Sequence, residues 1–206
     1  DHTTLVPMPG SKTDFLYQLA NNSGAVVHFN GEFGYGQPRD LQQKLVFEVL
    51  REARELFNQL ETSYGIPTAG FRPVVGHHLG RGVGGMIVSD KIEGVTYRAG
   101  KDLDEAVRPA ARRLIGKLSD YLLDKHDNDD RFLSDIGPID QYVYDREADE
   151  FVLVDMDPYV GGGYMYEGMY LSNVSSWAKH VLPGAEFESW HRHMVQAIKP
   201  ADREVA

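Results

Sequence analysis

Aspartates gather at two places where short apolar segments end. Residues 135–140 read Asp-Ile-Gly-Pro-Ile-Asp, and the apolar residues 151–154 are followed by Asp-Met-Asp. A carboxylate at the end of a buried strand costs desolvation free energy unless a cation or a proton offsets it. Ordinary turns also collect solvated aspartates, and this explanation suits Asp145 and Asp149. It suits Asp155 poorly, because four apolar residues precede that position.

The composition indicates one globular domain with an acidic surface. The chain has 206 residues, of which 42% are hydrophobic, and this is enough for a real core. Its net charge of -10 argues against nonspecific binding to nucleic acids or anionic membranes, which requires a basic surface. The absence of cysteine excludes disulfides, zinc–thiolate sites and thiol nucleophiles.

No segment of the sequence is expected to span a membrane or to direct secretion. There is no run of about 18 consecutive apolar residues. Residues 1–4 show neither the basic nor the apolar region of a secretory signal. We therefore expect either a cytoplasmic protein or one that is exported without a cleaved signal peptide.

Helices and strands are both expected around the aspartates. Apolar residues recur at helical spacing over residues 41–62, with Asp40 as the expected N-cap. A second long helix is expected after Asp102, with Pro109 close to its start. Residues 161–170 indicate either a mobile substrate loop or an irregular crossing. Further elements are three N-terminal strands in meander order, two strands within 71–88, the hairpin of 142–144 with 151–154, and short helices near 172–180 and 186–198.

The order of these elements and the spacing of the aspartates resemble the protein-kinase-like fold. The catalytic loop of that family reads Asp-x-x-Pro-x-Asn, and residues 135–140 are similar to it, with Asp140 in place of Asn. The family's metal-binding Asp, which follows the next hairpin, corresponds to Asp155. The resemblance implies an α+β, two-lobed fold. Residues 1–89 would form a small antiparallel sheet with one long helix, and residues 90–206 a reduced, mostly helical lobe.

The resemblance assigns a role to each aspartate. Asp135 would orient the acceptor hydroxyl and accept its proton. Asp140 and Asp155 would hold Mg²⁺, and Asp157 would add a ligand or only a charge. Magnesium bridges the oxygens of a transferred phosphoryl group and prefers hard oxygen ligands, so carboxylates suit these positions. ATP and Mg²⁺ are the cofactors that this implies.

The phosphate-binding side departs most from the family. Gly10, Ser11 and Lys12 stand where a glycine-rich loop would cover the phosphates, although an ordinary hairpin turn explains them equally well. His28 occupies the position of the family's phosphate-binding Lys, and Glu48 lies about where its ion-pairing Glu would be. An imidazole is only partly charged at neutral pH, so we expect Lys12 to supply the fixed positive charge.

The linker of residues 89–94 resembles the hinge that hydrogen-bonds adenine through backbone groups. By that alignment the contacts would be the Asp90 carbonyl and the Ile92 amide. Such recognition leaves no side-chain signature, so the assignment is positional.

Several functions remain open at this point. The resemblance implies a minimal kinase, similar in size to compact bacterial effector kinases, that phosphorylates a hydroxyl of a protein partner. A catalytically impaired pseudokinase is the alternative, because His28 and residues 133–134 replace family residues. A small-molecule kinase is also open. A haloacid-dehalogenase-like phosphatase would use residues 155–157 as its Asp-x-Asp motif, but too little chain follows for a doubly wound sheet.

Overall fold

The chain forms an α+β fold, as the sequence predicts. The computed structural model describes residues 5–7, 16–19, 22–30, 39–78, 82–98, 103–128, 130–155 and 160–198. The helices within these residues are α1 (Arg39–Tyr64), α2 (Arg108–Asp127), α3 (Tyr164–Ala178) and α4 (Gly184–Ala197), with three 3-10 turns, η1 (Glu105–Val107), η2 (Ser134–Ile136) and η3 (Ile139–Gln141). The strands are β1 (Leu5–Pro7), β2 (Leu16–Leu19), β3 (Asn22–Asn30), β4 (Arg72–His78), β5 (Gly82–Asp90), β6 (Val95–Thr96), β7 (Phe132–Leu133), β8 (Tyr142–Asp145), β9 (Glu150–Leu153) and β10 (Val160–Gly161).

The largest sheet is antiparallel and has the strand order β1-β2-β3-β5-β4. The predicted N-terminal meander is confirmed, since β1 pairs with β2 and β2 with β3. Strand β3 lies in the middle of the sheet, where His28 is paired with Ile87 of β5. A central strand is hydrogen-bonded on both edges, so the position of His28 along the sheet is fixed from both sides.

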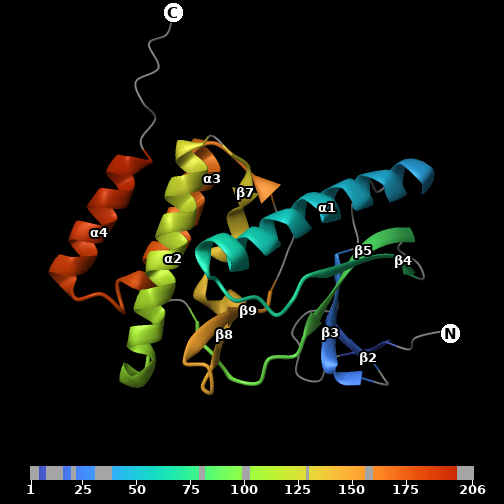
Figure 1. Ribbon diagram of the computed structural model, residues 1–206, viewed down its shortest axis with the longest axis horizontal. Helices are drawn as coiled ribbons and strands as arrows, with labels where there is room; N and C mark the ends of the chain where they lie inside the picture. Colours follow the sequence, from blue (N-terminus) through green and yellow to red (C-terminus); the bar gives the residue numbers. More distant parts are fainter. Residues whose placement is uncertain are drawn as a thin grey trace, which may run out of the picture.

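Helix α1 crosses this sheet alongside β5 and β4 (Figure 1). Leu50 packs directly against Gly85 of β5, where an added Cβ would lie 3.1 Å from its Cδ1 atom. The helix is longer at both ends than the predicted residues 41–62. Asp40 therefore lies inside the helix, and its prediction as the N-cap is wrong. The buried face of the helix consists of Val46, Leu50, Ala53, Leu56, Phe57 and Leu60.

Two smaller antiparallel sheets follow, with strand orders β6-β8-β9 and β10-β7. The predicted β8–β9 hairpin is confirmed, whereas the two-residue strands β6 and β10 were not predicted. The segment after α1 joins the hairpin through an isolated parallel bridge between Thr68 and Leu153. Among the described strands all ladders are antiparallel, so the doubly wound sheet of a haloacid-dehalogenase-like phosphatase is not formed, and that alternative is wrong.

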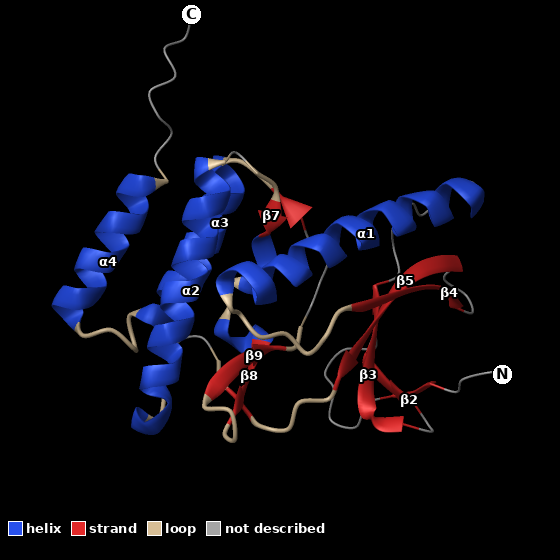
Figure 2. Cartoon of the chain, viewed as in Figure 1, coloured by secondary structure: helices blue, strands red, loops and turns tan. Residues whose placement is uncertain are grey.

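Helices α2, α3 and α4 lie on the far side of the hairpin from the large sheet (Figure 2). Helix α2 begins at Arg108 with Pro109 in its first turn, a position that needs no backbone donor. Helix α3 begins at Tyr164, so most of the stretch 161–170 is helix, and its prediction as a loop or crossing is wrong. Trp177 of α3 and Tyr121 of α2 are fully buried where these helices meet the core.

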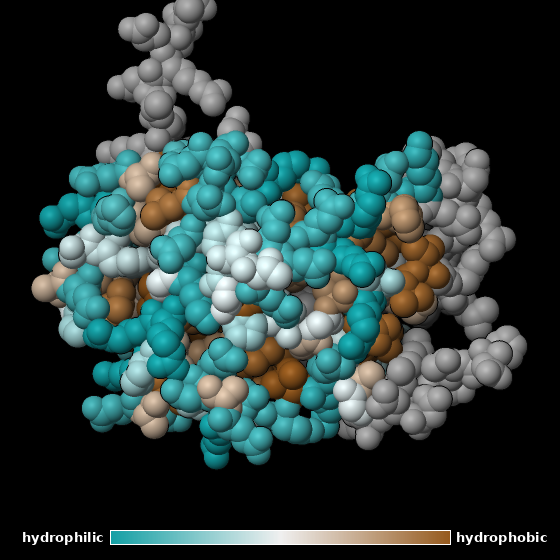
Figure 3. Space-filling model, in the orientation of Figure 1, coloured by the Kyte–Doolittle hydropathy of each residue, from teal (hydrophilic) through white to brown (hydrophobic). Residues whose placement is uncertain are grey.

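The visible surface is mostly hydrophilic, with apolar side chains gathered near the place where α1 crosses the large sheet (Figure 3). Phe47 on α1 and Val74 and Val75 on β4 are exposed hydrophobic side chains. Within the described part of the chain, no helix has both the length and the apolar character needed to cross a bilayer.

Candidate functional site

The acidic segment before β8 forms the two short turns η2 and η3, separated by Pro138. Asp135 has φ −99° and ψ 16°, outside the helical region, and Pro138 is extended with ψ 139°. Ile136 and Ile139 are buried in the core, whereas Asp135 is half-buried and Asp140 is exposed. The apolar side chains therefore anchor the segment and leave the carboxylates toward its outer side.

At the open end of the β8–β9 hairpin, the backbone of Asp155 lies close to the backbone that follows Asp140. The last pair of the hairpin is Tyr142 with Leu153. Beyond it, the amides of Val154 and Asp155 both donate to the carbonyl of Gln141, at 2.9 and 3.2 Å. Asp140 is the residue immediately before Gln141, so the backbone of two predicted acidic residues, Asp140 and Asp155, meets at Gln141.

His28 approaches the same point from the large sheet. Its Nδ1 atom lies 3.7 Å from the Asp155 Oδ1 atom. The His28 side chain is 21% exposed and that of Asp155 is 45% exposed, so both remain accessible to a ligand. A separation of 3.7 Å is longer than a hydrogen bond but short enough for an ion pair when the imidazole is protonated.

A chain of backbone hydrogen bonds fixes the distance between the hairpin and β3. The Ala69 amide donates to the Leu153 carbonyl of β9, and the Ala69 carbonyl accepts from the Asp90 amide. The next residue, Lys91, donates its amide to the carbonyl of Gly24 in β3. These bonds connect β9 to β3 through one continuous layer of backbone, which explains why His28 and Asp155 can meet.

Asp90, which belongs to the predicted adenine-binding linker of residues 89–94, is the last residue of β5. The carboxylate of Asp90 is 2.7 Å from the Arg72 guanidinium. Ile92 is partly buried against the hydrophobic core. An open pocket of about 420 Å³ lies beside this linker and is lined by Lys91, Ile92, Glu93, Gly94, Asp145, Arg146 and Glu147. The roles of the Asp90 carbonyl and the Ile92 amide toward adenine stay predictions.

Glu48 lies on the solvent-facing side of α1. It is 3.9 Å from Lys44, one helical turn earlier, and its side chain is 49% exposed. The acid next to His28 is instead Asp155. Val46 and Leu50, on the other face of the helix, occupy the positions that turn toward the sheet. A role for Glu48 in nucleotide binding stays a prediction.

Four predicted residues lie outside the described part of the chain: Gly10, Ser11, Lys12 and Asp157. Within the described residues, no group of three or more His, Asp and Glu side chains is arranged to hold a metal ion. Magnesium in phosphoryl-transfer sites is commonly held by one or two carboxylates together with substrate phosphates and water. The roles of Asp140 and Asp155 as metal ligands stay predictions.

The far end of the hairpin is held by Asp149. Its carboxylate accepts hydrogen bonds from the Tyr144 hydroxyl at 2.7 Å and from the Arg113 guanidinium of α2 at 2.8 Å. The hydrogen bond from Tyr144 and then that from Arg113 hold the pKa of Asp149 below its ordinary value. Asp149 also has φ 51°, a left-handed conformation that Asp tolerates better than most residues. These contacts attach the β8–β9 hairpin to helix α2. Asp155 follows the opposite, open end of this hairpin.

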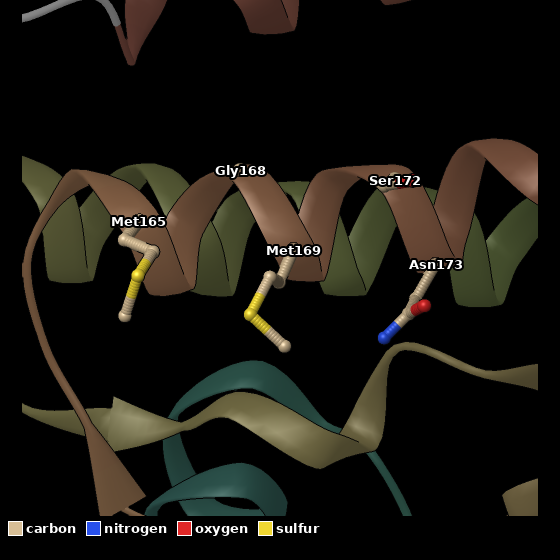
Figure 4. Close-up of a pocket in the computed structure, with 5 residues that line it drawn as sticks. All are labelled: Met165, Gly168, Met169, Ser172 and Asn173. Carbon is tan, nitrogen blue, oxygen red and sulfur yellow. The ribbon is translucent and has the colours of Figure 1, made fainter.

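The sequence interpretation missed a pocket on α3. It has a volume of about 440 Å³ and is lined by Met165, Gly168, Met169, Ser172 and Asn173. Both methionine side chains and the Asn173 amide point to the same side of the helix (Figure 4). This pocket adjoins the acidic segment, because the Asn173 Cβ atom lies 3.0 Å from the position of an added Cβ on Gly137. The spacing of Met165 and Met169, four residues apart, is the signal of a shared helix face that could have indicated this pocket. The neighbouring glycines indicated a loop instead.

No protein-family model matches the sequence, and no curated protein matches it significantly. Among solved structures, the chain is similar to the aminoglycoside phosphotransferase APH(3'')-Id from Streptomyces rimosus, which was solved in complex with ADP and streptomycin. The two chains share 12% identity and have a TM-score of 0.45, with 96% of this chain and 86% of that chain covered.

Proposed function

We propose that this chain is an ATP- and magnesium-dependent phosphotransferase with a compact protein-kinase-like fold, whose small lobe is residues 1–89 and whose larger lobe is residues 90–206. The observation that supports this most is the 3.7 Å approach of His28 to Asp155. The resemblance in sequence places the phosphate-binding cation at the first position and the metal-binding carboxylate at the second. A nucleotide site requires a phosphate-binding group and a metal-binding group close together. His28 and Asp155 come close although one lies in the large sheet and the other follows the β8–β9 hairpin.

The carboxylates divide the chemistry between them. Asp140 and Asp155 would hold Mg²⁺, which, when bound, bridges phosphate oxygens and neutralises the charge that develops on them. Asp157 would add a ligand or a charge. Asp135 would accept the proton of the attacking hydroxyl, as a carboxylate base within hydrogen-bonding reach of it.

The remaining predicted residues would bind the nucleotide. Protonated His28 attracts phosphate, and Lys12, with the amides of Gly10 and Ser11, would cover the phosphates. Glu48 would lie with these residues on the phosphate-binding side, as the family's ion-pairing Glu does. At the linker, the carbonyl of Asp90 and the amide of Ile92 would bind adenine through its hydrogen-bonding edge.

The acceptor we propose is a hydroxyl group of a protein. The α3 pocket adjoins the acidic segment, so an acceptor bound there would reach toward Asp135. Met165 and Met169 line it, with 66% and 55% of their surface exposed. Flexible thioether side chains adapt to apolar groups of different shapes, which suits a protein segment.

The test is transfer of labelled phosphate from the γ position of ATP. Because the acceptor is unidentified, both labelling of the chain itself and release of inorganic phosphate are followed in the presence of Mg²⁺. Asp135→Asn should lower the rate by about 10²–10⁴-fold, the usual effect of losing a general base. Asp120→Asn, a change of an exposed aspartate on α2, should leave it unchanged. Equal rates for the wild type and Asp135→Asn would contradict the proposal.

A pseudokinase that binds nucleotide without turnover is the second candidate. The observation that favours it is the imidazole of His28 at the position where the family has a permanently charged Lys. Binding of MgATP without any transfer or hydrolysis would select this function over the first.

A further inference from the structure

The loop that contains Asp135 is held by side chains to which the proposed function gives no role. Asp135 lies in η2, shortly after β7. Leu133 lies before it, and Ile136 and Gly137 follow it. Each of these three neighbours has one backbone group bonded to a buried aromatic side chain, so hydrogen bonds enclose Asp135 on both sides.

Two of these bonds act on the carbonyls of the two residues that follow Asp135. The Tyr142 hydroxyl donates to the Ile136 carbonyl at 2.8 Å, and the Trp177 Nε1 donates to the Gly137 carbonyl at 2.9 Å. Both aromatic side chains are 0% exposed. A buried carbonyl has no water to replace a missing donor, so each bond strongly favours one orientation of its peptide group.

The third bond acts on the residue before the loop. The amide of Leu133 donates to the Tyr121 hydroxyl at 2.8 Å, and both residues are fully buried. Tyr121 belongs to α2, whereas Trp177 belongs to α3 and Tyr142 to β8. Three different elements thus fix the backbone around one aspartate.

The donors keep their protons over the whole working range of pH. Burial raises the pKa of Tyr142 far above its ordinary value, so its hydroxyl remains a donor. The indole of Trp177 is a donor only. Neither bond is therefore lost through deprotonation of its donor near neutral pH.

The loop also cannot move toward α3. A Cβ added to Gly137 would lie 3.0 Å from the Asn173 Cβ and 3.1 Å from the Tyr170 carbonyl oxygen. The backbone at Gly137 is therefore in direct contact with the helix that provides Trp177. Such close packing leaves the peptide group little room to rotate.

We propose that Tyr142 and Trp177 are positioning residues, which fix the peptide groups that follow Ile136 and Gly137 and thereby set the direction of the Asp135 carboxylate. The positioning follows from the contacts described above. Its consequence for catalysis rests on the proposed function, in which Asp135 is the base.

The test compares Tyr142→Phe and Trp177→Phe with a matched control, Tyr170→Phe. Tyr170 is also fully buried, and its hydroxyl also donates to a backbone carbonyl, that of Leu118 in α2, at 3.1 Å. All three variants lose one buried donor, but only the first two lose a bond to the loop. Thermal unfolding of each variant reports the general loss of stability that all three share.

Amide hydrogen exchange of peptides covering residues 133–141 measures the positioning without requiring activity. We expect exchange at least about tenfold faster than in the wild type for Tyr142→Phe and Trp177→Phe, and unchanged exchange for Tyr170→Phe. If Tyr142→Phe exchanges there like Tyr170→Phe, the positioning proposal is overturned.

Steady-state turnover of MgATP measures the catalytic consequence. Tyr142→Phe should lower kcat by about ten- to a hundredfold with KM for ATP unchanged, because the nucleotide contacts are elsewhere. A lowered kcat in Tyr170→Phe as well would mean that stability, not positioning, is the cause, and would overturn the proposal. Absence of turnover in the wild type would instead contradict the proposed function, while the exchange experiment would still decide the positioning.

Discussion

The imidazole of His28 and the carboxylate of Asp155 approach to 3.7 Å, although His28 belongs to the large sheet and Asp155 follows the β8–β9 hairpin. One group attracts phosphate when it is protonated, and the other attracts a metal ion. In the proposed function, these two groups would bind the phosphates and the metal ion of one metal nucleotide. The backbone bonds through Ala69 and Asp90 hold this arrangement.

Substitution of His28 tests the phosphate half of the site. His28→Ala should weaken MgATP binding by about tenfold, roughly 1.4 kcal/mol, because a cation near the phosphates is lost. His28→Lys should bind at least as tightly as the wild type, since a Lys remains charged. Isothermal titration calorimetry measures both affinities.

Equal affinities for the wild type, His28→Ala and His28→Lys would show that the side chain at position 28 does not bind phosphate.

The approach of β6 to β8 requires a glycine at position 94. A Cβ there would lie 2.2 Å from the Tyr144 carbonyl oxygen and 2.6 Å from the Val143 Cγ1 atom, which is closer than atoms can pack. Gly94→Ala should therefore destabilise the chain by about 1–3 kcal/mol, measured by urea unfolding.

Gly116 is the matched control for this substitution. It is exposed in the middle of α2, and nothing lies within 4 Å of its added Cβ. Gly116→Ala should stabilise the chain by about 0.5–1 kcal/mol, because Ala favours the helical conformation. Equal effects at the two positions would contradict the close contact at Gly94.

Asp149 gives a pH dependence with a defined sign. Its pKa is lower in the folded chain than the ordinary value of 3.8, because of Tyr144 and then Arg113. Its contribution to stability is therefore complete above about pH 4 and is lost as the pH falls through the folded value. Asp149→Asn, which tolerates the left-handed conformation, should have a lower Tm than the wild type at pH 6.

This difference in Tm should shrink as the pH approaches 3, since protonated Asp149 is as uncharged as Asn. Thermal unfolding followed by circular dichroism at several pH values measures it. A difference that stays constant from pH 6 to pH 3 would mean that the charge of Asp149 does not stabilise the hairpin.

The elements with strong periodic patterns were predictable, and the short ones were not. Helix α1 has apolar residues at helical spacing from Val46 to Leu60, and the β8–β9 hairpin has a clear turn. The two-residue strands β6 and β10 are too short to show a pattern. The start of α3 was missed because Gly161–Gly163 and Gly168 indicate a loop, whereas the buried Tyr170 and Trp177 pack it as a helix.

The candidate site was predictable only through the resemblance to a family. Aspartate spacing indicated Asp135, Asp140 and Asp155, but no pattern in the sequence connects His28 with Asp155. Their approach depends on pairing between distant strands, which a local pattern does not encode.

The central claim is that Asp155 helps to hold magnesium and ATP. Thermal unfolding of the wild type with ATP, with and without Mg²⁺, tests it most directly. At a ligand concentration of about 100 Kd, binding contributes roughly 2.7 kcal/mol, so Tm should rise by about 5–10 °C. We expect this rise only with Mg²⁺ present, its loss in Asp155→Ala and its retention in Asp120→Ala. A wild-type Tm that ATP and Mg²⁺ leave unchanged, or an equal rise in Asp155→Ala, would contradict the claim.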